Sequence, residues 1–172
     1  VYGDFDWEWM GEEGYTVQMK DFTLVIAGGS GRGTLYGVYG FLESLGCRFF
    51  APDCETVPKM ETILLDPDYR DSQRPAFSFR DVFWACAFDE EWSVKQRVNS
   101  CFNLFNRTLG RSISPEWGGG ISNAGPQHVH NFEMLVPVDK YFESHPEYFS
   151  EINGKRTSEF LYSQLCLTNE DV

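Results

Sequence analysis

Carboxylate and imidazole side chains with the spacing of reactive groups gather in the second half of the sequence. Asp89-Glu90-Glu91 has the composition of a general acid–base pair, but it stands where a helix is expected to begin, which favours capping and helix-dipole stabilisation. His128 and His130 are two positions apart, so on a strand both would project from one face like metal ligands. No third ligand stands at a recognisable spacing, and His145 is a weak candidate. We therefore predict no catalytic residue and no metal site among these groups.

Arg80, Trp84 and Trp117 have the chemistry to bind a polyhydroxylated ligand. A planar guanidinium holds two hydroxyl groups or one carboxylate at once, and an indole offers an apolar face to the C–H groups of a sugar ring. Core packing is the expected role of Trp84. Trp117 lies in the segment 107–127, which is rich in Gly, Ser, Asn and Pro, and is the better candidate for a ligand contact. Loops of that length are often functional.

A cluster of glycines at residues 27–46, AGGSGRGTLYGVYGFLESLG, has the appearance of a phosphate-binding loop. No register of these glycines reproduces the dinucleotide pattern G-x-G-x-x-G, and Thr34 stands where a P-loop needs lysine. We therefore predict that no nucleotide binds and that the glycines serve a tight strand-to-helix turn. Gly37 and Gly40 would let the helix approach the sheet closely, and Arg32 is expected to pair with an acidic neighbour.

Composition restricts the function further. The 172 residues are 42% hydrophobic and 16% aromatic, which predicts a packed core, and their net charge of −12 disfavours nucleic acid and acidic membrane surfaces as partners. No apolar run approaches the length of a membrane span. The five cysteines are irregularly spaced and form no Cys-x-x-Cys motif, so a zinc site or redox motif is not expected, and no cofactor is predicted. Whether Cys47 and Cys54 pair is left open.

The chain order expected from hydrophobic periodicity begins with an acidic, irregular lead-in over residues 1–13. The elements that should follow are a hairpin of strands 15–19 and 22–27, a helix over 35–45 ended by Gly46, and strands at 48–50 and 61–65. The polar segment 66–75 has two prolines and is the best domain boundary.

Beyond that boundary, the patterns predict a strand, two helices and a hairpin. The expected elements are a strand at 77–87, a helix capped by Asp89, a short helix from Pro137, a hairpin with its turn at Asn153-Gly154, and a strand at 164–167. Thr168 should cap a further helix that the last residue, Val172, cuts short, so we expect the sequence to be a fragment of a longer protein.

Residues 32–59, RGTLYGVYGFLESLGCRFFAPDCETVPK, resemble an element of the non-catalytic N-terminal domain of family 67 α-glucuronidases and family 20 β-hexosaminidases. RPAFSFRDVFWACAFDEEW, HNFEMLVPVDKYFESHPEYFSEINGKR and QLCLTNEDV resemble a bacterial family, domain of unknown function 4838, in which an accessory domain precedes a (β/α) barrel. The resemblance implies an α+β fold. Residues 1–70 would be a partial β-β-α-β-β accessory domain like domain 2 of the hexosaminidases, lacking its N-terminal half. Residues 75–172 would be the first βα units of an incomplete TIM-type barrel.

The same resemblance implies a function. The chain would be a fragment of a glycoside hydrolase acting on poly- or oligosaccharide, secreted, periplasmic or on the cell surface, with the remainder of its own barrel as partner. The fragment itself would not be catalytic, because the carboxylates of families 20 and 67 come from later strands. The alternative is a non-catalytic carbohydrate-binding or scaffolding protein on the same fold.

Three substrate-binding residues are expected: Arg80, His130 and Trp117. A histidine matching His130 precedes the LVP segment of the resembling family, which implies a place at the barrel mouth. An arginine near the end of the first barrel strand contacts sugar in family 20, which implies the same for Arg80. The alternative for Arg80 is a structural pair with a barrel carboxylate.

Overall fold

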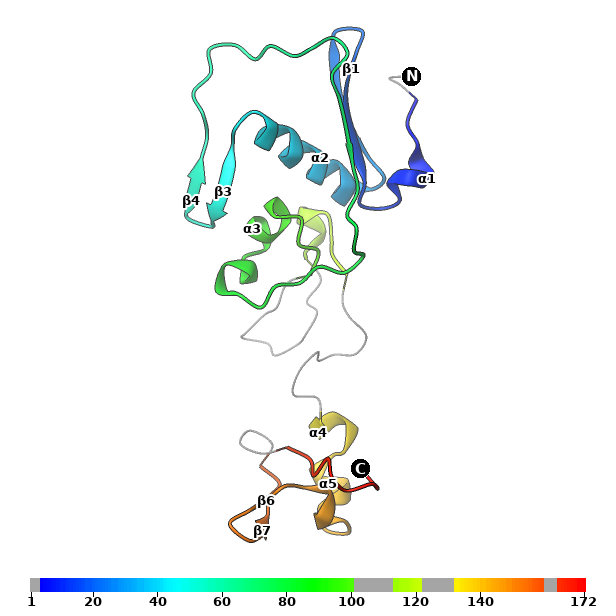
Figure 1. Cartoon of the computed structure of the whole chain (residues 1–172), viewed down its shortest axis with the longest axis vertical. Coiled ribbons are helices and arrows are strands. Elements are labelled where there is room, and N and C mark those ends of the chain that lie inside the picture. The colour runs from blue at the N-terminus through cyan, green and yellow to red at the C-terminus, as the bar shows by residue number, and fades with distance from the viewer. Residues whose placement is uncertain (1–3, 101–112, 122–131, 160–163) are drawn as a thin grey trace. The chain divides into compact units, whose positions relative to one another are not determined.

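The computed structural model describes residues 4–100, 113–121, 132–159 and 164–172. They belong to two compact units, Val1–Pro126 and Gln127–Val172, each of which is described by itself (Figure 1). The chain is mixed α+β, with small antiparallel sheets and few helices among the described residues. None of these helices is both long and apolar enough to cross a membrane.

A three-stranded antiparallel sheet of order β2-β1-β5 organises the first unit (Figure 1). β1 (Tyr15–Lys20) and β2 (Thr23–Gly28) form the predicted hairpin, which is confirmed. Its two turn residues, Asp21 and Phe22, both have positive φ, 49° and 61°, as a type I′ turn requires. β5 (Arg70–Gln73) pairs with the other edge of β1.

The helix after the glycine turn, α2 (Gly31–Ser44), begins four residues earlier than the predicted start at Leu35. The hydroxyl of Ser30 caps it by accepting from the N–H groups of Arg32 and Gly33, at 3.2 and 3.5 Å. Gly46, with φ of 96°, follows its end, as predicted.

Two glycines inside α2 allow the helix to lie directly on the sheet. A Cβ at Gly37 would stand 2.8 Å from Cγ2 of Ile26, and one at Gly40 would stand 2.3 Å from the hydroxyl of Tyr15. The predicted close approach of helix and sheet is therefore confirmed. The core of the unit lies between these layers and the segments packed on them, and consists of Tyr15, Val17, Tyr36, Val94 and Ile113.

Short elements complete the first unit. They are α1 (Trp7–Met10), β3 (Arg48–Ala51) paired with β4 (Cys54–Thr56), the 3-10 turns η1 (Ala85–Phe88) and η2 (Pro115–Trp117), and α3 (Glu90–Lys95). Asp89 caps α3 as predicted, since its carboxylate accepts from the N–H of Trp92 at 2.7 Å. Cys47 and Cys54 are free thiols.

Two predicted strands are wrong. Residues 61–65 are a mostly exposed segment outside any described strand, and β3 pairs with β4. Residues 77–87 contain no strand either. There Arg80 meets Asn99 instead: its carbonyl accepts from the N–H of Asn99 at 3.1 Å, and its own N–H donates to Oδ1 of Asn99 at 2.8 Å. Apolar composition predicted these strands, but a strand also needs a neighbour to pair with.

The compact units do not follow the predicted junction at residues 66–75. β5 lies within that segment and completes the sheet of the first unit, so the chain on both sides of it belongs to one unit. The assignment of residues 1–70 to an accessory domain and of 75–172 to the start of a barrel stays a prediction.

The second unit is built from short elements. They are α4 (Phe132–Leu135), α5 (Val138–Tyr141), the 3-10 turn η3 (Pro146–Tyr148), β6 (Glu151–Ile152) and β7 (Lys155–Arg156). The predicted hairpin is confirmed, with Asn153 and Gly154 at φ of 53° and 76°. The predicted strand at 164–167 is a single bridge between Leu165 and Phe149, and the last residues form turns where a helix was expected.

Candidate functional site

The carboxylate of Glu13, which lies just before β1, holds together three distant parts of the first unit. Its Oε1 accepts from Nε of Arg32 at 2.8 Å, Nη2 of Arg80 at 2.9 Å and Nδ2 of Asn99 at 2.9 Å. Its Oε2 accepts from Nη1 of Arg80 at 3.0 Å, so Arg80 grips the carboxylate with two parallel bonds. Glu13 and both arginines are largely buried. The prediction that Arg32 pairs with an acidic neighbour is confirmed.

The guanidinium of Arg80 has protein acceptors for all five of its N–H groups. Besides the two bonds to Glu13, Nε donates to the carbonyl of Arg97 at 2.7 Å, Nη1 to the carbonyl of Phe77 at 2.6 Å, and Nη2 to the hydroxyl of Tyr36 at 3.4 Å. Arg80 is therefore held in a structural ion pair, and its partner is Glu13 where a barrel carboxylate was expected. A sugar contact by Arg80 stays a prediction, and it would require these partners to be exchanged.

The protonation states at this cluster are set by burial and by the arginines. Burial alone would raise the pKa of Glu13, but hydrogen bonds from Arg80 and Asn99 and the charges of both arginines outweigh it and place the pKa below its usual value. Burial, followed by the charge of Glu13, raises the pKa of Tyr36 to about 12. Glu13 is thus a fixed anion and Tyr36 a fixed phenol at neutral pH. Neither is tuned for proton transfer near pH 7.

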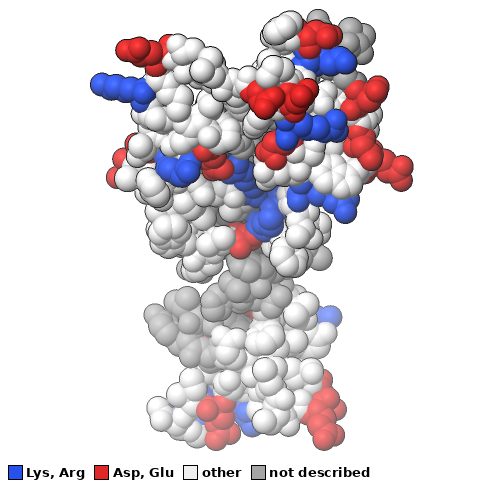
Figure 2. Space-filling model, turned by 45° about the horizontal axis from the view of Figure 1, so that its top comes forward, with Lys and Arg blue, Asp and Glu red and all other residues white. Residues whose placement is uncertain are grey.

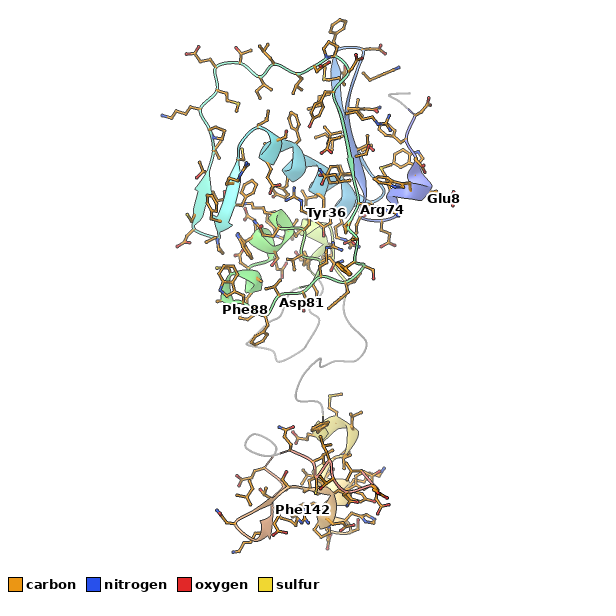
Figure 3. All side chains as sticks on the ribbon, viewed as in Figure 1. Glu8, Tyr36, Arg74, Asp81, Phe88 and Phe142 are labelled. Carbon is orange, nitrogen blue, oxygen red and sulfur yellow. The ribbon has the colours of Figure 1, made fainter. Side chains whose placement is uncertain are left out.

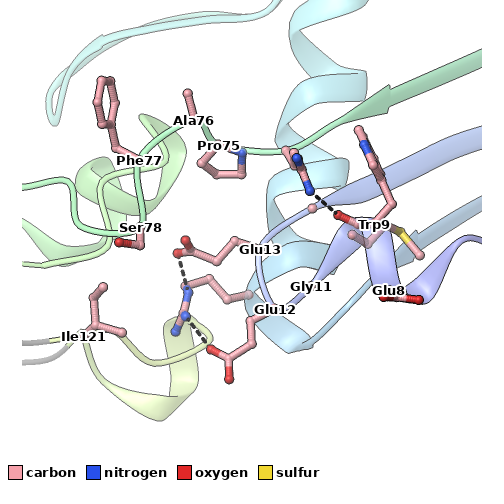
Figure 4. A pocket seen from close by; sticks show the side chains of 14 residues that line it. Glu8, Trp9, Gly11, Glu12, Glu13, Pro75, Ala76, Phe77, Ser78 and Ile121 are labelled. Atoms are coloured by element: carbon pink, nitrogen blue, oxygen red, sulfur yellow. Dashed lines mark hydrogen bonds and ion pairs between the residues drawn. The ribbon is translucent and has the colours of Figure 1, made fainter.

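A cavity of about 540 Å³ opens beside Glu13 (Figure 4). One wall is α1 with the loop that follows it, and the other is the segment after β5. Figure 4 shows the Glu13 carboxylate pointing across the cavity toward Ser78. The lining residues are Glu8, Trp9, Met10, Gly11, Glu12, Glu13, Gly14, Arg32, Arg74, Pro75, Ala76, Phe77, Ser78 and Ile121. The volume is within the range of about 300–1,000 Å³ that is usual for small-molecule sites.

The chemistry of this cavity is mixed. It combines the indole-bearing Trp9 with carboxylates and guanidinium groups, and Arg32 also reaches Oε2 of Glu12 at 3.4 Å. The guanidinium of Arg74 lies 5.4 Å from the ring centroid of Trp9 and donates to its carbonyl at 3.2 Å. Acidic and basic side chains are likewise interspersed on the face of the first unit that Figure 2 shows. Such a lining suits a ligand with many hydroxyl groups, each of which can donate and accept.

A second, smaller cavity of about 210 Å³ adjoins the first. Its lining residues are Glu13, Tyr15, Tyr36, Gln73, Arg74, Pro75, Arg80, Gln96 and Arg97. Glu13, Arg74 and Pro75 line both cavities. Figure 3 labels Tyr36 and Arg74 in this region of the first unit.

Of the predicted ligand-binding residues that the structure describes, Arg80 lines the smaller cavity and Trp117 lines neither cavity. Trp117 is half-buried and packs against the core of the first unit, and it lines neither cavity described above. Trp84, for which core packing was expected, is 53% exposed and meets Trp92 edge to face at 5.5 Å between ring centroids. The exposure of Trp84 differs from the core packing expected of it, and a ligand contact by Trp117 stays a prediction. His130 and its neighbour His128 lie outside the described residues.

The remaining candidates from the sequence have local partners. His145 stacks on Tyr148 at 4.6 Å between ring centroids, and its Nδ1 lies 3.0 Å from Oε1 of Glu147. Within the described ranges, no three His, Cys, Asp or Glu side chains form a group that could hold a metal ion. Residues 8–13 and Arg74 were missed by the sequence analysis, which treated the first segment as a lead-in and the second as a linker. The Glu-Trp and Glu-Glu pairs in WEWMGEEG were the available signal.

Comparison with known protein families places the chain in a family. The family described as domain of unknown function DUF4838 matches residues 49–172, which is more than half of the chain. The matched range includes Arg74, Arg80 and Asn99, and it leaves out Glu13 and α2. No curated protein and no solved structure matched.

Proposed function

The chain belongs to the family described as domain of unknown function DUF4838, and from that premise we propose that it is part of a glycoside hydrolase acting on poly- or oligosaccharides. In this proposal the first unit contributes carbohydrate binding through the larger cavity. The finer architecture proposed with it is an accessory α/β layer followed by the opening of a (β/α) barrel.

The lining of the larger cavity is the observation that carries the proposal. A sugar ring presents apolar C–H faces and a rim of hydroxyl groups. The indole of Trp9 suits the first, and the carboxylates and guanidinium groups around it suit the second. The volume of about 540 Å³ accommodates one or two sugar rings.

The order of elements gives further support. The succession β1, β2, α2, β3 and β4 is the strand-strand-helix-strand-strand order expected of the accessory domain that residues 32–59 resemble. In this setting Glu13 is a structural group rather than a catalytic acid, because its charge is held by two arginines and its pKa is lowered.

A binding experiment tests the proposal. Calorimetric titration of the purified chain with neutral and acidic oligosaccharides should show binding that Trp9→Ala weakens about threefold to tenfold, as expected from the loss of roughly 0.5–1.5 kcal/mol of aromatic contact. Trp7→Ala is the matched control, because Trp7 lies on the same helix but does not line the cavity. Equal losses in both variants, or binding by neither variant nor wild type, would contradict the proposal.

A non-catalytic carbohydrate-binding or scaffolding protein is the second candidate. It is favoured by the fixed protonation states of Glu13 and Tyr36, which leave the central cluster without a group that exchanges protons near pH 7. Activity assays on the native protein from its source separate the two. Hydrolysis of aryl glycosides supports the hydrolase, whereas oligosaccharide binding without hydrolysis supports the second candidate.

A further inference from the structure

Arg74 differs from the other arginines that line the two cavities. Arg32 and Arg80 are paired with Glu13, and the guanidinium of Arg97 forms two bonds of 2.7 Å with the carboxylate of Glu43. Arg74, in contrast, meets no carboxylate of the described residues. Its guanidinium makes one hydrogen bond to them, to the carbonyl of Trp9, and it stacks on that indole. Most of its N–H groups are therefore available to a ligand.

The position of Arg74 also suits a contact with a ligand. It follows the last residue of β5 and is one of the three residues that line both cavities, so a ligand that extends from one cavity into the other would lie beside it. The stacking on Trp9 holds the planar group near the ring that we propose for sugar contact. An arginine held in this way presents a fixed fork to an oxyanion.

The smaller cavity has the chemistry of an anion subsite. Three of its lining residues are arginines, Arg74, Arg80 and Arg97, and one is a carboxylate, Glu13, which is already shared by two arginines. Two acidic groups whose charges act on the lining residue Tyr15 already have partners: Asp71 accepts from the amide of Gln73, and Glu43 is bonded to Arg97.

The volume of the smaller cavity and a tyrosine hydroxyl in its lining also fit a small charged group. The volume of about 210 Å³ accommodates a substituent better than a second ring with its hydroxyl groups. Tyr15 also lines it, and burial followed by the charge of Asp71 raises the pKa of this tyrosine, so its hydroxyl keeps its proton at neutral pH.

We propose that the ligand of the larger cavity carries an anionic substituent, a carboxylate or a sulfate, which Arg74 binds at the entrance of the smaller cavity. This inference rests on the proposed carbohydrate binding and adds the charge of the sugar to it. Arg74 selects for the charged sugar, and the ring stays in the larger cavity beside Trp9.

The test compares three ligands that differ only at one carbon: a methyl glycoside, the matching methyl glycuronoside, and the matching 6-sulfate. Each is titrated into the full 172-residue chain, into Arg74→Ala and Arg74→Lys, and into Arg70→Ala as a control. Arg70 lies at the other end of the same strand and lines neither cavity, and circular dichroism verifies that each variant is folded.

The charged ligands should bind about ten- to a hundredfold tighter than the neutral glycoside, as expected for hydrogen bonds to a charged group. Arg74→Ala should remove this preference, so that the neutral and charged glycosides bind with equal affinity, Arg74→Lys should keep part of it, and Arg70→Ala should keep all of it. The preference should also fall as salt is raised. Preference for only one of the two charged ligands would identify which oxyanion the site accepts.

Two results separate this inference from the function on which it rests. Equal affinity for the neutral and charged glycosides overturns the anion subsite and leaves the carbohydrate site standing. A preference for charged ligands that survives in Arg74→Ala also overturns the role of Arg74. Binding of none of the three ligands by the folded wild-type chain contradicts the carbohydrate site and the anion subsite together.

Discussion

At the scale of single residues, the fold of the first unit depends on one buried carboxylate. Glu13 is bonded to Arg32, Arg80 and Asn99, which lie far apart in the sequence and reach it from α2, from the segment after β5, and from the segment after α3. If that carboxylate is lost, few other groups are placed to compensate the positive charges of the two arginines. Buried charges that lose their partner are among the costliest defects in a protein.

Glu13→Gln should therefore destabilise the first unit by about 3–5 kcal/mol, because it leaves two largely buried guanidinium groups facing a neutral amide. Urea unfolding monitored by tryptophan fluorescence measures the change. Glu12→Gln is the matched control: its side chain is 81% exposed, and its loss should change the free energy of unfolding by less than about 1 kcal/mol. Similar effects of the two substitutions would show that the cluster contributes little.

The stability of the wild-type chain should also depend on pH through Glu13. Since its pKa in the folded protein is lowered, the stabilisation is fully present above the pKa of the unfolded chain, near 4.5. It is lost as the pH falls from there through the folded-state value. The free energy of unfolding, measured between pH 7 and pH 3, should fall less steeply in Glu13→Gln than in the wild type. Parallel profiles would contradict the lowered pKa.

At the scale of elements, the glycines between β2 and α2 have a spacing that fits either a phosphate-binding loop or a turn with a crowded main chain. Gly28 and Gly33 have the spacing of a phosphate loop, yet they are needed because the main chain is crowded. A Cβ at Gly28 would stand 2.0 Å from the N atom of Thr34, and one at Gly33 would stand 2.6 Å from the carbonyl oxygen of Gly14. Gly33 itself lies in α2, so close packing rather than positive φ makes a side chain unacceptable there.

Two glycines in the first turn of α2 should respond oppositely to the same substitution. Gly33→Ala should cost about 1–3 kcal/mol, since its methyl group would meet the carbonyl oxygens of Gly14 and Glu12. Gly31→Ala has open space around its Cβ and should be neutral or stabilise the helix by up to about 1 kcal/mol. Melting temperatures of the two variants test this pair, and a stabilised Gly33→Ala would show that the loop before β1 can move away.

The turn of the β1–β2 hairpin offers a stabilising substitution. Phe22 has φ of 61° and is 96% exposed, so its ring contributes almost no packing while its Cβ strains the backbone. Phe22→Gly should raise the free energy of unfolding by about 0.5–1 kcal/mol, because glycine adopts this conformation freely. Phe22→Ala removes the ring but keeps the Cβ, and it should gain less. An equal gain in both variants would assign the effect to the ring instead of the turn.

At the scale of the whole molecule, the units revealed by packing differ from those suggested by composition. The polar segment 66–75 has the residues of a linker, but β5 within it pairs with β1, and Arg80 beyond it binds Glu13 before β1. The first unit therefore needs residues on both sides of this segment.

A dissection experiment should distinguish these two boundaries. Residues 1–126 expressed alone should unfold cooperatively, because the sheet, α2, α3 and the Glu13 cluster all lie within them. Residues 1–69 should not fold, because they lack β5, Arg80 and Asn99. Circular dichroism with urea unfolding measures both, and cooperative unfolding of residues 1–69 would favour the predicted junction.

The sequence by itself determined the elements whose signals are local. The β1–β2 hairpin, the cap of Asp89 on α3, the end of α2 at Gly46 and the Asn153-Gly154 turn each follow from a few neighbouring residues. Alternation, a capping oxygen or a glycine of positive φ is sufficient to specify each of them.

Only the tertiary structure decided which distant residues meet. Nothing local marks Glu13 as the partner of Arg80, Arg74 as a residue that lines two cavities, or Trp117 as partly buried against the core and Trp84 as exposed. The apolar segments 61–65 and 77–87 likewise have the composition of strands, but among the described residues they find no strand to pair with. Long-range pairing depends on how elements pack, and hydrogen bonds and ion pairs across more than sixty residues leave no periodic signal in the chain.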